Sequence, residues 1–318
     1  TIQQEKLNNQ VAELDVATSE NNIQESIAQV YIQILYAAES VKVNESTLQV
    51  SIAQRDRGQE LLNAGSIAKS DFAQLEAQVS TDRYQLVTAQ ATLQDYKLQL
   101  KQLLELDGEN EMNIYLPALS DENVLAPLPT KKDVYIRALS LRPEIEASKL
   151  NVEASELGIG IAKSSYLPTI SLSAGIGTNH TSGSDFTFGE QVKNGWNNSI
   201  GLSVSVPIFN NRQTKSAVQK AKLQYETSML SLLDEQKTLY KTIEGLWLDA
   251  NSAQQRYAAA NEKLKSTQIS YELISEQFNL GMKNTIELLT EKNNLLQAQQ
   301  EQLQAKYMAI LNTQLLKF

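Results

Sequence analysis

The sequence predicts a mainly α-helical protein with a small β part, built from two structural repeats that each contain a long antiparallel coiled-coil hairpin. Three observations predict this fold. Apolar residues recur every seven positions over most of the chain. Two glycine-centred breaks, at Gly65 and Gly281, interrupt this pattern 216 residues apart. Near the middle of the chain, two segments instead alternate apolar and polar residues, as strands do.

Residues 1–63 are expected to form one helix, because they contain no proline and only one glycine, Gly58. Such a helix would be roughly 90 Å long and needs neighbours along its length. Gly65 is expected to end it, and Ser66 or Ser70 to cap the next helix. The next helix has charged Asp82 as the one exception in its apolar seam, which consists of Phe72, Val79, Leu86, Leu93 and Leu100 with Leu75, Ala89, Tyr96 and Leu103. Residues 1–115 would thus be the helical hairpin of the first repeat.

Residues 116–165 are expected to be a connector with short helices. The heptad pattern stops near Leu106, and Pro117, Pro127 and Pro129 follow among polar residues. Short helices are expected at about 132–140 and 143–164, where Pro143 suits the first helical turn.

Residues 166–209 predict a β-hairpin of two strands, each about 11 residues long, separated by an 18-residue polar loop at 178–195. A tilted strand needs about 9–11 residues to cross a bilayer. One face of each strand is apolar and the other is Ser, Thr and Gly without charge, which favours lipid on one side and water on the other. The predicted lipid-facing residues are Ile170, Leu172, Ile176, Ile200, Leu202 and Val204, and the predicted interfacial aromatics are Tyr166, Trp196 and Phe209. The alternative is an ordinary soluble hairpin with one buried face.

Residues 210–318 repeat the first hairpin. A helix over 210–280 has a seam at Tyr257, Leu264, Tyr271 and Phe278, and a second seam follows Gly281 at Leu289, Leu296, Leu303 and Ile310. The 216-residue offset also pairs other positions, among them Leu7 with Leu223, Ile23 with Leu239, Ile27 with Ile243, Val30 with Leu246, Tyr31 with Trp247, and Asp71 with Glu287.

Composition excludes several classes of function. The net charge of −9 disfavours a nucleic-acid partner. The chain has no cysteine and one histidine, His180, so neither a cysteine nucleophile nor a histidine-based triad or metal cluster is available. The glycines at 175 and 177 precede a strand instead of a helix, which fits a sheet better than a phosphate loop. No enzyme activity and no cofactor are therefore expected.

No run of 18 apolar residues is present, so no membrane-spanning helix is expected. No signal peptide is visible at Thr1, where the sequence opens within a polar helical pattern. This start favours a mature or truncated product.

Four segments resemble the TolC-type outer-membrane efflux proteins: Arg142–Ile145, Tyr166–Ser171, Val206–Asn211, and Phe278–Gly281 followed by Glu287. The resemblance covers nearly the whole chain. It implies a homotrimer that forms a β-barrel in the outer membrane of a Gram-negative bacterium and an α-barrel of helices through the periplasm. It also implies a periplasmic adaptor and an inner-membrane pump as partners. Family members have a strand pair in each repeat. The offset would place the first pair upstream of Thr1, so the chain is expected to be a fragment without it.

The tips of the two hairpins are the predicted functional sites. Asp71 and Glu287 each follow a turn glycine by six residues, about 9 Å along the helix. An acid in the first turns of a helix often only stabilises the helix dipole. Because the pair repeats at one offset, we expect both acids to line the periplasmic aperture and to favour cations.

The resemblance adds roles for other residues at the tips. Gly65 and Gly281 would contact the adaptor, and Lys283 would link to Asp71 or Ser70 across a hairpin interface and hold the resting tube shut. Lys283 could instead pair only with Glu287, four residues on. Thr290 stands where many family members have a second aspartate, so the constriction would be less acidic.

The predicted function is a passive exit duct for drugs or other substrates in a tripartite efflux or type I secretion system. Two alternatives are a periplasmic adaptor protein, which also has a long helical hairpin, and a soluble coiled-coil scaffold. An adaptor normally has one hairpin between lipoyl-like halves, whereas this sequence has two hairpins and no such halves. A scaffold would leave the alternating strands unexplained.

Overall fold

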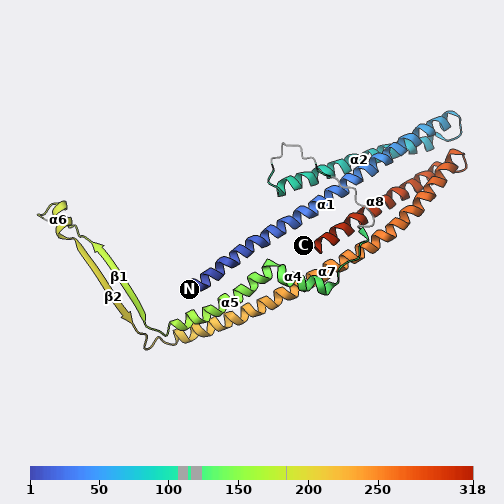
Figure 1. The fold of residues 1–318 in the computed structure, drawn as a ribbon. Coiled ribbons are helices and arrows are strands. Elements are labelled where there is room, and N and C mark those ends of the chain that lie inside the picture. Colours follow the sequence, from blue (N-terminus) through green and yellow to red (C-terminus); the bar gives the residue numbers. More distant parts are fainter. Residues whose placement is uncertain (107–113, 116–123, 184, 318) are drawn as a thin grey trace. The chain divides into compact units, whose positions relative to one another are not determined.

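The computed structural model of the chain describes residues 1–106, 114–115, 124–183 and 185–317. Pro117 of the expected connector lies outside these residues. The described chain is mainly helical, with one two-stranded sheet (Figure 1). It divides into two compact units: one comprises 1–15 with 143–235, and the other comprises 16–142 with 236–318.

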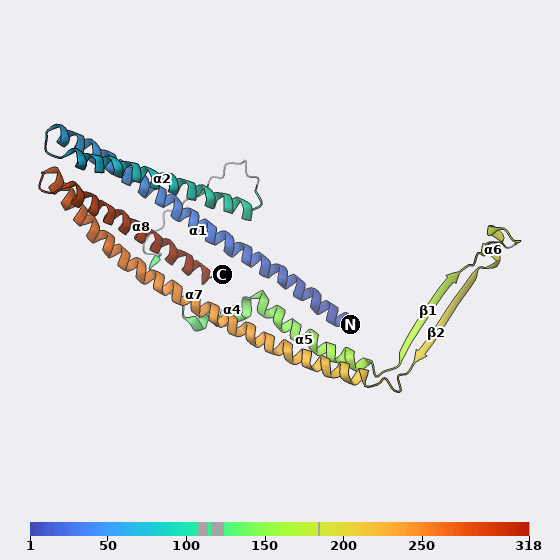
Figure 2. The same cartoon turned by 180° about the vertical axis from the view of Figure 1, so that it is seen from behind.

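The larger unit contains two helical hairpins, as the sequence predicts. Helix α1 (Ile2–Asn63) turns back into α2 (Lys69–Leu103), and α7 (Gln213–Asn279) turns back into α8 (Thr285–Leu315). Figures 1 and 2 both show the two helices of each hairpin running side by side from a common turn. At the turns, the observed ends of α1 and α7 lie within one residue of the predicted ones, because Gly65 and Gly281 mark these boundaries.

Apolar layers between α1 and α8 join the two hairpins. Ile32 and Leu35 of α1 pack with Leu303 and Tyr307 of α8 in one buried cluster. Tyr36 meets the Tyr307 ring edge-on, with 6.2 Å between the ring centroids. Leu303 belongs to the heptad seam of α8, so the seam read from the sequence serves packing between hairpins as well as within them.

The segment that leads into α4 (Lys131–Leu141) packs against α7 and is hydrogen-bonded to it. Val124 is buried against Tyr257. Gln254 Nε2 donates to the carbonyl oxygens of Val124 and Ala126 at 3.0 and 2.8 Å. Trp247 Nε1 donates to the Pro129 carbonyl at 2.9 Å. The prolines keep this segment out of regular secondary structure, so its backbone carbonyls need other donors. These side-chain hydrogen bonds supply them.

The smaller unit contains α5 (Pro143–Ser164), the strands and the ends of two long helices. Gln4 of α1 donates to the Ala154 carbonyl at 3.1 Å, and Ser155 bonds Ser228 of α7 at 2.7 Å. Strands β1 (Thr169–Gly177) and β2 (Asn197–Ser205) pair antiparallel, from Thr169 with Ser205 to Gly177 with Asn197.

Two details differ from the sequence prediction for the hairpin. Each strand has nine residues instead of about 11, because Pro168 and Pro207, which lack an N–H group, flank the paired segment. The expected polar loop also contains a short helix, α6 (Phe188–Asn194). The Glu190 carboxylate caps this helix by accepting from both the backbone N–H and the hydroxyl of Thr187.

Candidate functional site

The two hairpin turns are built in the same way. Gly65 and Gly281 have positive φ values of 71° and 74°, in the left-handed region that glycine adopts without strain. The N–H of Gly65 donates to Leu62 O and that of Ser66 to Leu61 O, at 2.9 and 2.8 Å. The equivalent bonds after α7 run from Gly281 to Phe278 and from Met282 to Gln277, both at 2.9 Å. Each helix therefore ends in the same C-terminal capping motif.

The predicted acids cap the helices that follow these turns. Asp71 accepts from the Ala68 backbone N–H at 3.3 Å, and Glu287 accepts from that of Asn284 at 3.2 Å. The Asn284 side chain returns a bond to the Glu287 N–H at 2.9 Å, which completes a capping box. The prediction that Ser66 or Ser70 caps α2 is wrong: the N-cap position is Ala68, and the Asp71 carboxylate satisfies its N–H.

Lys283 pairs with Glu287 within its own hairpin. The Nζ to Oε1 distance is 2.5 Å. Hydrogen bonds from Lys283 and from the Asn284 backbone hold the pKa of Glu287 below its ordinary value. This is the second of the two pairings expected for Lys283, and the link to Asp71 or Ser70 across a hairpin interface stays a prediction. The Thr290 hydroxyl donates to the Ile286 carbonyl at 2.8 Å. As a neutral side chain, Thr290 adds no charge to the tip.

The two turns lie at the same level. Gln54 Nε2 donates to the Tyr271 hydroxyl at 2.9 Å, and Gln78 Nε2 donates to Asn293 Oδ1 at 3.4 Å. The residue numbers in these pairs differ by 217 and 215, within one residue of the 216 that separates the turn glycines. The hairpins therefore lie alongside each other with their tips together (Figures 1 and 2), and both capping acids fall at this end.

A buried polar cluster lies behind the turns, and the sequence prediction missed it. Asp82 of α2 and Lys292 of α8 form an ion pair, and their side chains are 1% and 3% exposed. The Ser51 hydroxyl of α1 also donates to Asp82, and Gln78 Nε2 donates to its other carboxylate oxygen at 3.0 Å. Burial lowers the pKa of Lys292, while the hydrogen bond to Asp82 acts in the opposite direction.

A signal for this cluster exists in the heptad pattern. Asp82 interrupts the apolar seam of its helix, and Lys292 falls three positions after Leu289, at the same kind of core position. Two opposite charges at core positions of two helices predict a buried pair, provided that the two helices are known to meet.

The hairpin strands present the predicted apolar face on one side. Across the sheet, Ile170 lies opposite Val204 and Leu172 opposite Leu202, while the intervening pairs consist of Ser, Thr, Gly and Asn. Every residue of both strands is exposed in the chain, including Ile200 at 83%. The predicted aromatics Tyr166, Trp196 and Phe209 are exposed just outside the strand ends.

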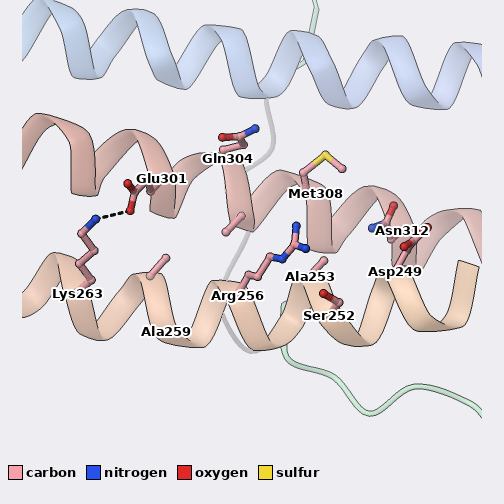
Figure 3. A pocket seen from close by; sticks show the side chains of 12 residues that line it. Asp249, Ser252, Ala253, Arg256, Ala259, Lys263, Glu301, Gln304, Met308 and Asn312 are labelled. Atoms are coloured by element: carbon pink, nitrogen blue, oxygen red, sulfur yellow. Dashed lines mark hydrogen bonds and ion pairs between the residues drawn. The ribbon is translucent and has the colours of Figure 1, made fainter.

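A groove of about 640 Å³ runs between α7 and α8 (Figure 3). Small side chains such as Ala253, Ala259 and Ala305 form much of its lining. Lys263 and Glu301 pair across it at 2.6 Å. The sequence prediction did not identify this groove, because heptad periodicity predicts that the two helices pack but not where their side chains leave a hollow.

The described residues contain no group of three or more His, Asp or Glu side chains that could hold a metal ion. His180 stacks edge-on against Phe188, with 5.2 Å between ring centroids. Within the same residues, no helix has a stretch apolar enough and long enough to cross a membrane.

Comparison with known proteins gives the relatives of the chain. It is 24% identical over 290 residues to the outer membrane efflux protein BepC of Brucella suis, an alignment that covers 91% of the chain and 60% of BepC. It is 23% identical over 311 residues to the outer membrane protein TolC of Escherichia coli, covering 95% and 62% respectively. The chain thus spans about three-fifths of the length of these curated relatives.

A solved structure has the same fold. The outer-membrane channel OprN superposes with a TM-score of 0.79 at 19% identity, over 98% of this chain and 69% of that one. The family model described as "Outer membrane efflux protein" matches residues 134–317, which is more than half of the chain. The chain belongs to the outer membrane efflux protein family.

Proposed function

We propose that the chain is part of a passive export duct in the outer membrane of a Gram-negative bacterium, one that conducts drugs or other substrates out of the cell. Copies of the protein assemble as a homotrimer. The helical hairpins form an α-barrel through the periplasm, and the strands join a β-barrel in the membrane. An inner-membrane pump supplies energy and selects substrates, and a periplasmic adaptor contacts the turns at Gly65 and Gly281.

The observation that best supports this proposal is the exposed apolar face of the strands. Four large side chains, Ile170, Leu172, Ile200 and Leu202, are each about 70% exposed or more in the chain. A two-stranded hairpin is at best marginally stable in water, and an apolar patch of this kind needs a partner. Lipid on this face, with the uncharged Ser and Gly face toward water, satisfies both sides of the sheet. Neither a coiled-coil scaffold nor an adaptor requires a β-hairpin with one exposed apolar face.

The two turns lie at the same level, and this supports a further part of the proposal, that the acids at the hairpin tips line the aperture of the duct. Each copy brings Asp71 and Glu287 to one end of its hairpins, so three copies would gather six carboxylates around one aperture. Carboxylates that converge on a narrow opening raise the local concentration of cations. Capping its helix does not neutralise Asp71, whereas Lys283 offsets the charge of Glu287 through their ion pair.

Single-channel recording of the full-length protein in planar bilayers tests the aperture. We expect Asp71→Asn with Glu287→Gln to lower the preference for potassium over chloride, because both substitutions remove charge from the rim. The matched control is Asp133→Asn, since Asp133 likewise lies in the first turn of a helix, where Thr130 caps α4. Unchanged selectivity in the double variant would reject the aperture role. The absence of any channel from the unsubstituted full-length protein would reject the duct.

A further inference from the structure

The buried cluster of Ser51, Asp82 and Lys292 differs in kind from the contacts around it. Around it, Leu35 packs with Tyr307 and Gln54 donates to the Tyr271 hydroxyl, and neither of these contacts between the hairpins contains an ion pair. Replacing a buried ion pair with well-packed apolar residues is often neutral or stabilising. The cluster is therefore poorly explained by stability alone, and selection between alternative pairings is the best-attested use of such a group.

The internal repeat identifies the alternatives that the cluster discriminates. By the 216-residue offset, the counterpart of Lys292 in the first hairpin is Glu76, and the counterpart of Asp82 in the second hairpin is Ala298. The counterpart of Ser51 is Thr267, which also has a hydroxyl and therefore distinguishes nothing.

These counterparts make contacts between like hairpins unfavourable. If a first hairpin of another copy replaced α8 in this contact, Asp82 would meet Glu76, and two carboxylates would be buried together. If a second hairpin replaced α2, Lys292 would meet Ala298, and a buried ammonium would lose its counterion. Removing one partner of a buried pair is strongly destabilising. Only a first hairpin against a second one satisfies both charges.

We propose that Asp82 and Lys292 are specificity-determining residues. They make a first hairpin pack against a second one, as they do within this chain, and not against a like hairpin of another copy, so that first and second hairpins alternate when copies assemble side by side. This proposal rests on the proposed duct, because alternation has meaning only in an assembly. Two similar hairpins in every copy could otherwise pair like with like, and the ring would then lose its threefold order.

Cysteine cross-linking in the full-length protein tests the proposal, and these 318 residues contribute no cysteine of their own. Gln78 and Asn293 of one copy are hydrogen-bonded across the α2–α8 contact, so Gln78→Cys with Asn293→Cys gives an intramolecular cross-link where a first hairpin lies against the second hairpin of its own copy. Gln78→Cys alone can cross-link only where two first hairpins meet, and Asn293→Cys alone only where two second hairpins meet. A short bismaleimide serves as the probe.

With the native cluster, we expect an intramolecular cross-link in the double-cysteine protein and almost no cross-linked dimer of either single-cysteine protein. In the background Asp82→Leu with Lys292→Met, which keeps the volume but removes the charges, cross-linked dimers of the single-cysteine proteins should rise about tenfold or more. The exchanged pair Asp82→Lys with Lys292→Asp is a second variant, and it should restore the native pattern if it folds.

The outcomes separate this proposal from the duct itself. Associated copies that keep the native pattern in the apolar background would overturn the alternation and leave the duct intact. Copies that do not associate, as measured by mass photometry in detergent, would overturn both.

Discussion

At the scale of single residues, the Asp82–Lys292 pair makes a stability prediction. Lys292→Met leaves the Asp82 carboxylate buried with only Ser51 and Gln78 as donors, so we expect a loss of about 3–5 kcal/mol in the free energy of unfolding. Asp82→Leu combined with Lys292→Met should lie within about 1–2 kcal/mol of the parent. Urea titration followed by circular dichroism measures both. A double variant as unstable as the single one would show that the pair stabilises the fold by itself.

Tyr307 predicts a dependence on alkaline pH. Burial and the nearby Glu39 carboxylate raise the pKa of Tyr307 well above its ordinary value of 10.0. The unfolded phenol loses its proton near pH 10 while the folded one keeps it. The stabilisation is therefore complete below pH 10 and is lost as the pH rises above it.

We expect Tyr307→Phe to reduce this alkaline loss of stability. Denaturant titrations between pH 8 and 11.5 measure it, and Tyr84→Phe is the control, because Tyr84 is 74% exposed. Equal pH slopes in the Tyr307 variant and in the parent would contradict the assignment. Tyr36 and Tyr271, whose pKa values burial also raises, will leave part of the slope in place.

At the residue scale, the sequence predicted where the two acids lie along the chain but not the hydrogen bonds that they make. Asp71 and Glu287 could be placed after the turns because their distance from glycine repeats. Their hydrogen bonds to the Ala68 and Asn284 N–H groups could not be foreseen while Ser66 and Ser70 were the expected caps. Lys292 escaped notice because a lysine on a helix is usually solvated, and only a known neighbour makes its burial predictable.

At the scale of elements, glycine-to-alanine substitution is predicted to have opposite effects in the two turns and within helix α7. Gly65→Ala and Gly281→Ala should each destabilise by about 1–2 kcal/mol, because alanine resists a positive φ even where no atom lies within 4 Å of the added Cβ. Gly245→Ala is the matched control within α7, where the space is also free. It should stabilise by about 0.5–1 kcal/mol. Thermal unfolding of the three variants measures this, and stabilisation at all three positions would contradict the left-handed turns.

Long elements were predictable and short ones were not. Seven-residue periodicity over many turns, ended by Gly65 or Gly281, determines a long helix and its boundaries. Helix α6 has only seven residues, too few for any period, although the Thr187 to Glu190 spacing of a capping box would have indicated it. The strands were predicted from alternation alone, and their register pairs Ile170 with Val204 and Leu172 with Leu202 as that alternation requires, whereas Ile176 lies opposite Asn198.

At the scale of the whole molecule, the repeat is the feature that the sequence made most accessible. The offset of 216 predicts that two similar hairpins exist, but not that they lie side by side. The bonds from Gln54 to Tyr271 and from Gln78 to Asn293 establish that the tips are level. The groove between α7 and α8 was out of reach for a different reason: periodicity predicts that these two helices pack together, but not where their small side chains leave a hollow.

The proposed duct requires that the hairpin tips and the exposed apolar face of the strands belong to one hollow assembly. Electron cryomicroscopy of the full-length protein in lipid nanodiscs tests this most directly. We predict a threefold cylinder with an open interior, six hairpin tips at the end away from the membrane, and Ile170, Leu172, Ile200 and Leu202 against lipid. A compact single copy, with those four side chains packed inside protein, would contradict it.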